Sequence, residues 1–144
     1  MASRREEVLE ALLALIATAL PAAKVERNTA KPERIPVGGL AIIRDGDPGD
    51  PEATLSPLTY TYTHRIPIEI AVLAVAPLSR EETLDQMLRA LGEAVEANRT
   101  LGGLCDFLEP EAPSIDDIEA TGTIAGRWAS AVILATYATP NPLT

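Results

Sequence analysis

Hydrophobic and polar positions recur with two different periods along the chain, and each period predicts one kind of element. Apolar side chains recur every three or four positions from Val8 to Leu20, with charged residues before and between them, which predicts an amphipathic helix that ends at Pro21. A second helix begins at Ser79, whose hydroxyl can cap a backbone amide while Glu82 reaches back to the amide of Ser79. The apolar face of this helix consists of Leu84, Met87, Leu88, Leu91 and Val95.

A strand is predicted between the two helices, over residues 59–75. Its odd positions are mostly Thr, Arg, Pro and Glu, whereas its even positions form one apolar and aromatic face that also holds His64. Because each amphipathic helix must bury its apolar stripe, the pattern predicts an α+β fold, a mixed, mainly antiparallel sheet with two helices packed on one face. A length of 144 residues suits a single domain, residues 1–144.

The length of this strand predicts a projecting β-hairpin. Its 17 residues would extend about 55 Å, whereas a globular body of this chain length is about 35–40 Å across. We therefore expect the first half of the strand and a preceding strand near Leu40–Arg44 to form a hairpin arm, about residues 38–66, that leans out of the body. The alternative is a bulge at Pro67 that bends the strand. A free arm of alternating Thr and Tyr residues needs a partner.

The C-terminal part of the chain predicts further strands. Short strands are expected near Leu104–Leu108 and Ile115–Ala120, and a longer central strand from Ile124 or Arg127 to Tyr137. Trp128, near the start of the longer strand, is interpreted as a plug in the core or in an interface.

Composition limits the classes of function. The formal net charge of −9 opposes non-specific binding to nucleic acid, which depends on Lys and Arg. The apolar run of residues 8–20 is too short to cross a bilayer, and the acids before it argue against a signal peptide, so we expect no membrane partner. A single cysteine allows no internal disulfide, as expected of a protein from a reducing cytoplasm.

Charge is unevenly distributed along the chain. Residues 1–44 carry a net charge of +2, and residues 45–144 carry a net charge of −11. One end of the molecule could therefore attract the other end of a neighbouring copy, as a head-to-tail ring contact requires. The alternative interpretation is ordinary solubilising surface charge.

Candidate catalytic and ligand-binding residues are few. Cys105, in the stretch NRTLGGLCDF, would need a base to act as a nucleophile, and His64 is the only histidine. We therefore interpret Cys105 as a buried apolar residue and the glycine pair before it as a helix end, and we predict neither enzymatic activity nor a cofactor. The spaced acids of loop 45–52 do not match a calcium-binding loop, so no metal site is predicted. One alternative stays open, a module that binds an anionic ligand through Lys31, Arg34 and Arg44.

Four stretches of the sequence carry a resemblance to a known family. They are the helix REEVLEALLALI, the segment VERNTAKPERIPVGGLAIIRDGDPGDPEATLSPLTYTYTHRIPIEI, the helix and strand LDQMLRALGEAVEANRTLGGLCDFLEP, and the final TYATPNPL. Over nearly its whole length the chain resembles the tail terminator proteins of long-tailed bacteriophages, the minor tail protein U-like group, including forms from prophages and gene-transfer particles. The resemblance implies a structural subunit that forms a ring on the end of the tail tube, stops tube polymerisation and offers a surface for head joining.

The resemblance also implies partners and a location. The partners are further copies of the chain in a hexamer, the tail tube protein and a head-completion or connector protein, and the location is the virion tail, assembled in the cytoplasm of the bacterial host. DNA would only pass through the channel of the ring, and like-charge repulsion would keep it from sticking if loop 45–52 lines that channel. The candidate contact residues are Arg34, Arg44, Asp45, Asp47, Asp50, Tyr60, Tyr62 and Arg65. Alternatives are another head-tail connector or tail-tube component, or a Cys105-dependent acyltransferase-like enzyme.

Overall fold

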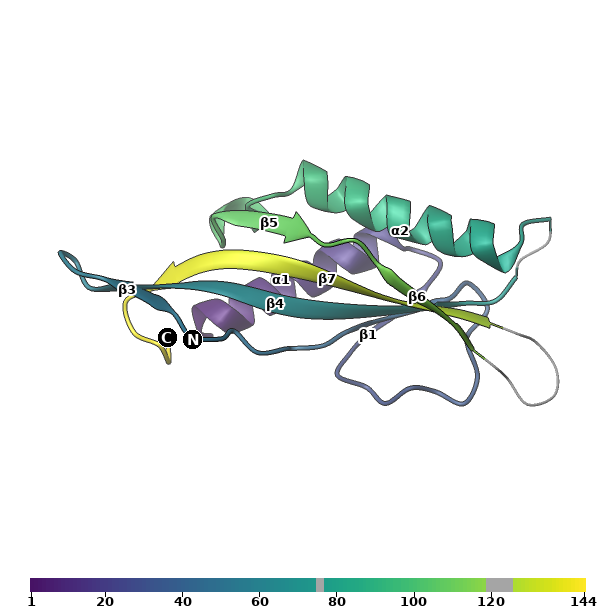
Figure 1. Cartoon of the computed structure of the whole chain (residues 1–144), viewed down its shortest axis with the longest axis horizontal. Helices are drawn as coiled ribbons and strands as arrows, with labels where there is room; N and C mark the ends of the chain where they lie inside the picture. The colour runs from purple at the N-terminus through teal and green to yellow at the C-terminus, as the bar shows by residue number, and fades with distance from the viewer. Residues whose placement is uncertain (75–76, 119–125) are drawn as a thin grey trace.

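The computed structural model of this chain describes residues 1–74, 77–118 and 126–144. Two α-helices and a seven-stranded, mostly antiparallel sheet form the fold, which confirms the predicted α+β class (Figure 1). The elements are α1 (Arg4–Ala19), β1 (Lys24–Arg27), β2 (Leu40–Ile43), β3 (Glu52–Thr54), β4 (Thr59–Val72), α2 (Arg80–Ala97), a 3₁₀ turn η1 (Leu101–Gly103), β5 (Phe107–Pro110), β6 (Ser114–Ile118) and β7 (Gly126–Thr139).

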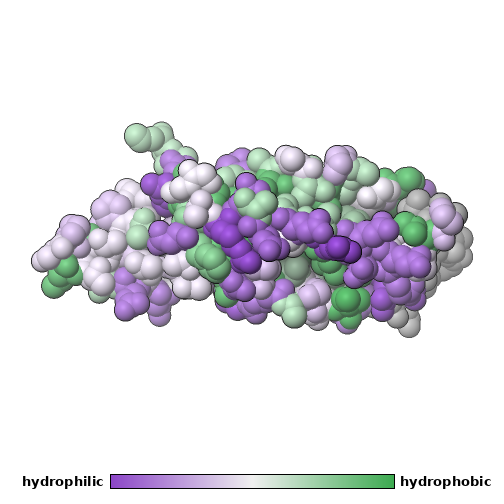
Figure 2. All heavy atoms as spheres, turned by 90° about the horizontal axis from the view of Figure 1, so that it is seen from above, coloured by the Kyte–Doolittle hydropathy of each residue, from purple (hydrophilic) through white to green (hydrophobic). Residues whose placement is uncertain are grey.

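A serine side chain caps the start of each helix. The Ser3 hydroxyl accepts a hydrogen bond from the Glu6 amide at the start of α1. At the start of α2 the predicted capping box is present, because the Ser79 hydroxyl accepts from the Glu82 amide while the Glu82 carboxylate accepts from the Ser79 amide. The apolar stripe of α2 is buried, and Figure 2, which views the molecule from the α2 side, shows mainly hydrophilic side chains along the middle of that face.

The sheet is built around two long strands that run side by side. Its order is β1-β2-β4-β7-β5, with β3 also paired to β4 and β6 also paired to β7. The β4–β7 register continues without a break from Tyr60 opposite Thr139 to Val72 opposite Arg127. Even-numbered residues of β4 and odd-numbered residues of β7 face the helices and form the main core with them. The prediction that the last strand is central, with neighbours on both sides, is confirmed.

The hairpin projects, but its predicted bounds are wrong. Residues 40–43 form β2, which pairs with the second half of β4 inside the body and is fully buried there. The strand that pairs with the start of β4 is β3, and the turn 55–58 between them lies at one end of an elongated molecule (Figure 1). The expectation of a globular body shorter than the long strand is wrong, because β7 is as long as β4. The long strand therefore stays paired along almost all of its length.

The alternative of a bulge at Pro67 is also wrong. Pro67 stands opposite Val132 in the continuous register of β4 and β7. Its carbonyl oxygen accepts a hydrogen bond from the Arg44 amide at 2.9 Å, and Arg44 follows the last residue of β2. The N–H and C=O of a strand residue face the same neighbouring strand, so the missing N–H of Pro67 faces Arg44, just beyond the end of β2, and removes no hydrogen bond from the β4–β7 ladder.

The face of the sheet away from the helices is covered only in part. Segment 28–39 lies over one end of this face, where Ile35 and Trp128 pack on the small apolar group of Leu40, Ile42 and Ala71. The ammonium group of Lys31 lies 4.2 Å from the centre of the Trp128 ring. Trp128 thus fills a small core of its own, in agreement with one of the two roles predicted for it.

The remaining strand predictions are confirmed in place and adjusted in bounds. The expected strand near residues 104–108 is β5, which begins at Phe107 because η1 occupies residues 101–103. The expected strand at residues 115–120 is β6, which begins at Ser114. Val75, Glu119, Ala120 and Ile124, which the predicted strands included, lie outside the described residues.

Candidate functional site

The predicted contact residues do not form one patch. Arg34 lies in segment 28–39, at the end of β4 far from the hairpin, whereas the other candidates follow β2 or lie on β4. The exposed candidates are Arg34, Asp47, Asp50 and Arg65. Arg44, Asp45 and Tyr60 are partly buried, and Tyr62 is buried, so the structure already uses several of these side chains within the subunit.

Arg27, which the sequence did not single out, ties three segments together. Its guanidinium donates to both carboxylate oxygens of Glu6, at 2.6 and 2.9 Å, and to both of Asp45, at 2.8 and 3.1 Å. It also donates to Glu10 at 2.8 Å. Hydrogen bonds from Arg27 hold the pKa values of Glu6 and Asp45 below their usual range. The cluster fastens α1 to β1 and to the loop that leads toward the hairpin, so Asp45 serves an internal contact.

His64 links that loop to β7. Its side chain is fully buried, with Nε2 2.6 Å from the backbone oxygen of Asp45 and Nδ1 3.0 Å from the hydroxyl of Tyr137. A backbone oxygen only accepts, so Nε2 carries the proton and donates, and the Tyr137 hydroxyl donates to Nδ1. Burial lowers the pKa of His64 and raises the pKa of Tyr137 to about 12, so both groups are neutral near pH 7.

Tyr62 belongs to the same internal cluster. Its ring stacks on Tyr137 with the ring centres 5.7 Å apart, and only 6% of the residue is exposed. Tyr62 is therefore an unsuitable contact residue for a partner, in contrast to the sequence-based prediction. The alternation of Tyr and Thr along the strand indicated a buried face correctly, but it did not reveal that Tyr137 of β7 would cover this position.

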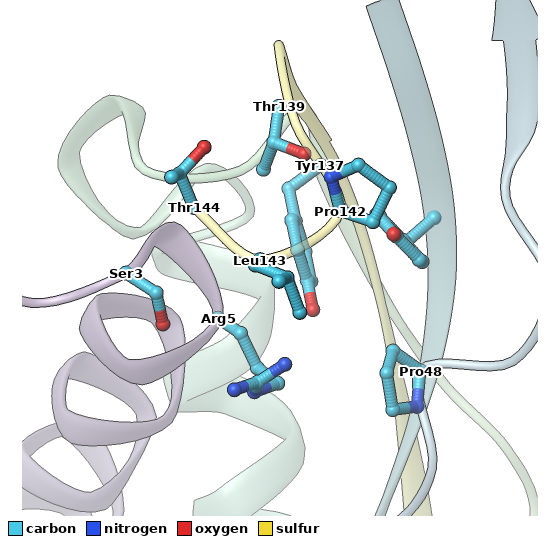
Figure 3. A pocket seen from close by; sticks show the side chains of 9 residues that line it. Ser3, Arg5, Pro48, Tyr137, Thr139, Pro142, Leu143 and Thr144 are labelled. Atoms are coloured by element: carbon cyan, nitrogen blue, oxygen red, sulfur yellow. The ribbon is translucent and has the colours of Figure 1, made fainter.

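A small pocket lies beside Tyr137, between the start of α1 and the C-terminal residues (Figure 3). Its volume is about 10 Å³, which is room for about one water molecule and too little for an organic substrate. Arg5 and Tyr137 both extend toward this space, and the Thr144 carbonyl oxygen nearby accepts a hydrogen bond from the Arg4 amide. The lining residues are Ser3, Arg5, Pro48, Tyr62, Tyr137, Thr139, Pro142, Leu143 and Thr144.

A larger recess of about 190 Å³ lies between α2 and the connection from β5 to β6. It is lined by Leu88, Leu91, Gly92, Val95, Pro110, Glu111, Pro113, Ala131 and Ile133. Glu111 is the charged residue of this lining, and its carboxylate pairs with Arg65. The recess is below the usual volume of a small-molecule site, which starts at about 300 Å³, and no set of polar groups converges in it.

The geometry argues against the Cys105-dependent enzyme. Cys105 is only 4% exposed, and its thiol lies 3.6 Å from the backbone oxygen of Arg99. Burial, followed by the charge of Asp106, raises the pKa of this thiol, which disfavours the reactive thiolate. Both ring nitrogens of His64 are engaged elsewhere, so His64 does not act as a base for Cys105. The glycine pair ends the helical segment as predicted, since Gly102 and Gly103 have φ angles of +69° and +95°.

The anion-binding alternative also lacks a convergent site. The Arg44 guanidinium donates to the Glu69 carboxylate at 2.7 Å and to the backbone oxygen of Thr29. Lys31 lies over the ring of Trp128, and Arg34 is exposed in the same segment, so neither converges with Arg44 on a common site. Among the described residues, no group of His, Cys, Asp and Glu side chains has an arrangement that could hold a metal ion. Neither helix within residues 1–74, 77–118 and 126–144 is long and apolar enough to span a membrane.

A scan against protein-family models found no matching family, and a search of curated proteins found no match.

Proposed function

We propose that this chain is a tail terminator subunit, a structural protein that forms a ring on the end of a phage tail tube, stops its polymerisation and provides a surface for head joining. The proposal combines the resemblance of the sequence with the surface of the structure. It places the protein in the virion tail, with copies of itself, the tube protein and a head-completion protein as partners.

One observation carries the proposal, the exposed apolar tip of the β3–β4 hairpin. Leu55 is 81% exposed and Leu58 is 46% exposed, both in the turn that projects beyond the body (Figure 1). All three residues of β3 are exposed, and among the described strands β3 pairs with β4 alone, so its outer edge can pair with another chain. A projecting turn with large apolar side chains is typical of a surface that is covered by another protein.

The hairpin tip is better suited to contact with another protein than the two pockets are. The pocket beside Tyr137 holds about one water, and the recess under α2 is apolar, so both are suited to packing rather than to chemistry. The hairpin, by contrast, has the reach and the exposed backbone of a contact element. This favours a protein whose work is assembly.

The proposal is tested by the length of polymerised tubes. Purified tube protein from the same genome is polymerised with and without this chain, and tube lengths are measured by negative-stain electron microscopy. We expect the chain to bind tube ends and to shorten the length distribution, because a capped end adds no further subunits. Gold labelling of the chain should mark ends, whereas labels along the tube would indicate a tube component and labels only on isolated connectors would indicate a head-tail connector.

A matched pair of variants separates the hairpin tip from general surface effects. Leu55→Ser should weaken capping, whereas Leu143→Ser removes an equally exposed leucine, also 81%, from the C-terminal segment and should cap as the wild type does. Tubes of unchanged length with no chain at their ends would refute the proposed function.

A further inference from the structure

We propose that copies of this chain associate head to tail, with the β3–β4 hairpin of one copy seated on segment 28–39 of the next. The inference deepens the proposed function, since such a contact would build the ring. The occupant is a second copy of the chain, because the two ends of the molecule carry charges of opposite sign and exposed apolar residues.

The hairpin end presents apolar side chains surrounded by unpaired acids. Leu55 and Leu58 are exposed in the turn, and Figure 2 shows hydrophobic side chains at this extremity. Asp47, Asp50 and Glu52 lead into the hairpin and are all exposed. Within the described part of the chain, none of these three carboxylates forms an ion pair.

The opposite end presents the complementary set. Among the described residues, three basic side chains form no ion pair, and they are Arg5, Lys31 and Arg34. Every other Lys and Arg is ion-paired. Lys31 and Arg34 lie in segment 28–39, which also holds the exposed acid Glu33, so the segment carries a net charge of +1. Val37 of the same segment is 92% exposed, the apolar counterpart of the leucines at the hairpin tip.

The two surfaces cannot meet within one molecule. The hairpin forms one end of the long axis, at the start of β4, whereas segment 28–39 lies beside the other end of β4, where Leu40 stands opposite Ala71 (Figure 1). A contact between two different patches is heterologous, so it closes into a ring when the rotation between copies allows it. Opposite charges would guide the encounter, while Leu55 and Val37 would supply apolar contact. The acids then serve contact between copies rather than the lining of the channel.

A charge exchange tests this contact. The hairpin variant carries Asp47→Lys, Asp50→Lys and Glu52→Lys, and the segment variant carries Lys31→Glu and Arg34→Glu. In each variant both ends have the same sign, so we expect self-association to weaken by about tenfold or more, measured by sedimentation velocity at low salt. In an equimolar mixture every hairpin again faces a segment of opposite charge, so association should return, with the two variants alternating.

The controls separate position from charge and from folding. Asp85→Lys with Glu96→Lys reverses two exposed acids on α2 and should associate as the wild type does. Arg34→Glu alone leaves the contact of Lys31 with Trp128 intact, so it should weaken association without loss of stability. Raised salt should weaken the wild-type contact as well, since exposed charges are screened.

Three results would overturn the contact. They are variants that associate like the wild type, a mixture that stays dissociated, and a wild-type chain that stays monomeric at about 1 mM, where a micromolar contact would be saturated. The tube assay is separate from these measurements. If the chain caps tubes but the mixed variants do not associate, the proposed function stands and this contact is refuted. If the mixed variants associate but tubes are never capped, this contact stands and the proposed function is refuted.

Discussion

Replacing Arg27 by Met should destabilise the fold by about 2 kcal/mol at pH 7. The Arg27 side chain is 18% exposed, and its partners Glu6, Glu10 and Asp45 are 42%, 60% and 44% exposed. Exposed ion pairs contribute about 0.2–1 kcal/mol each, so three pairs give about 1–3 kcal/mol after this discount for solvent. The variant also leaves three carboxylates close together without a cation. Equilibrium unfolding in urea measures the difference, because guanidinium salt would screen the charges.

The pH dependence of this difference has a definite sign. Arg27 lowers the folded-state pKa values of Glu6 and Asp45, so its contribution is fully present above about pH 4.5 and is lost as the pH falls through the folded-state values. The deficit of Arg27→Met should therefore shrink steadily as the pH falls below about 4.5. Arg27→Lys keeps the charge but cannot hold two carboxylates in a fork, so its loss should be intermediate.

The matched control is Arg89→Met. Arg89 pairs with Glu93 on the outer face of α2, where the two side chains are 78% and 66% exposed, so its loss should be about 0.3–0.5 kcal/mol. If Arg27→Met costs no more than Arg89→Met, or costs the same at pH 7 and pH 3, then the Arg27 cluster does not fasten α1 to the sheet in the way described.

Three further predictions concern single positions. Gly46→Ala should destabilise by at least about 2 kcal/mol in urea unfolding, since a Cβ there would lie 2.2 Å from the Arg65 backbone oxygen at a φ of +64°, whereas Gly49→Ala has open space at +72° and should cost only about 1 kcal/mol. Cys105 should react with a thiol reagent much more slowly in the native chain than in urea, because burial raises its pKa; rapid native labelling would contradict this. The free energy of unfolding should fall as the pH is lowered from 7 to 5.5, by at most about 1.4 kcal/mol per pH unit. The reason is that burial lowers the folded-state pKa of His64, so in this range only the unfolded chain takes up the proton. His64→Gln should remove that dependence, and a slope that persists in the variant would assign it to another group.

The sequence predicted the elements whose signal is local. The capping box at Ser79 and the alternation along β4 depend on neighbouring residues, and they agree with the structure. The β1 strand was missed because its four residues show no clear alternation and it is fixed by parallel pairing with β2, a contact between segments that are separated by a long loop. The bounds of the hairpin were wrong for the same reason, since strand pairing is set by tertiary contacts.

In the candidate site, too, the sequence predicted local features but not contacts between distant segments. Tyr62 lies on the buried face that its period indicates, yet the sequence did not show that Tyr137 would stack on it. Arg27 carried no local signal at all, because its carboxylate partners come from α1 and from the loop after β2. A polar side chain on the inner side of an otherwise apolar strand, such as His64, was the available signal for a buried network, and only the structure supplies its partners.

The long ladder between β4 and β7 determines how the subunit responds to mechanical load. A pull along the long axis acts in shear on this ladder, and its hydrogen bonds, which run perpendicular to the strands, share the force from Tyr60 to Val72. The hairpin is held by only three residues of β3, so the same pull would peel it open first. The body of the molecule should therefore resist a pull along its long axis better than the hairpin does, and a load applied at the tip would open the hairpin before it reached the body.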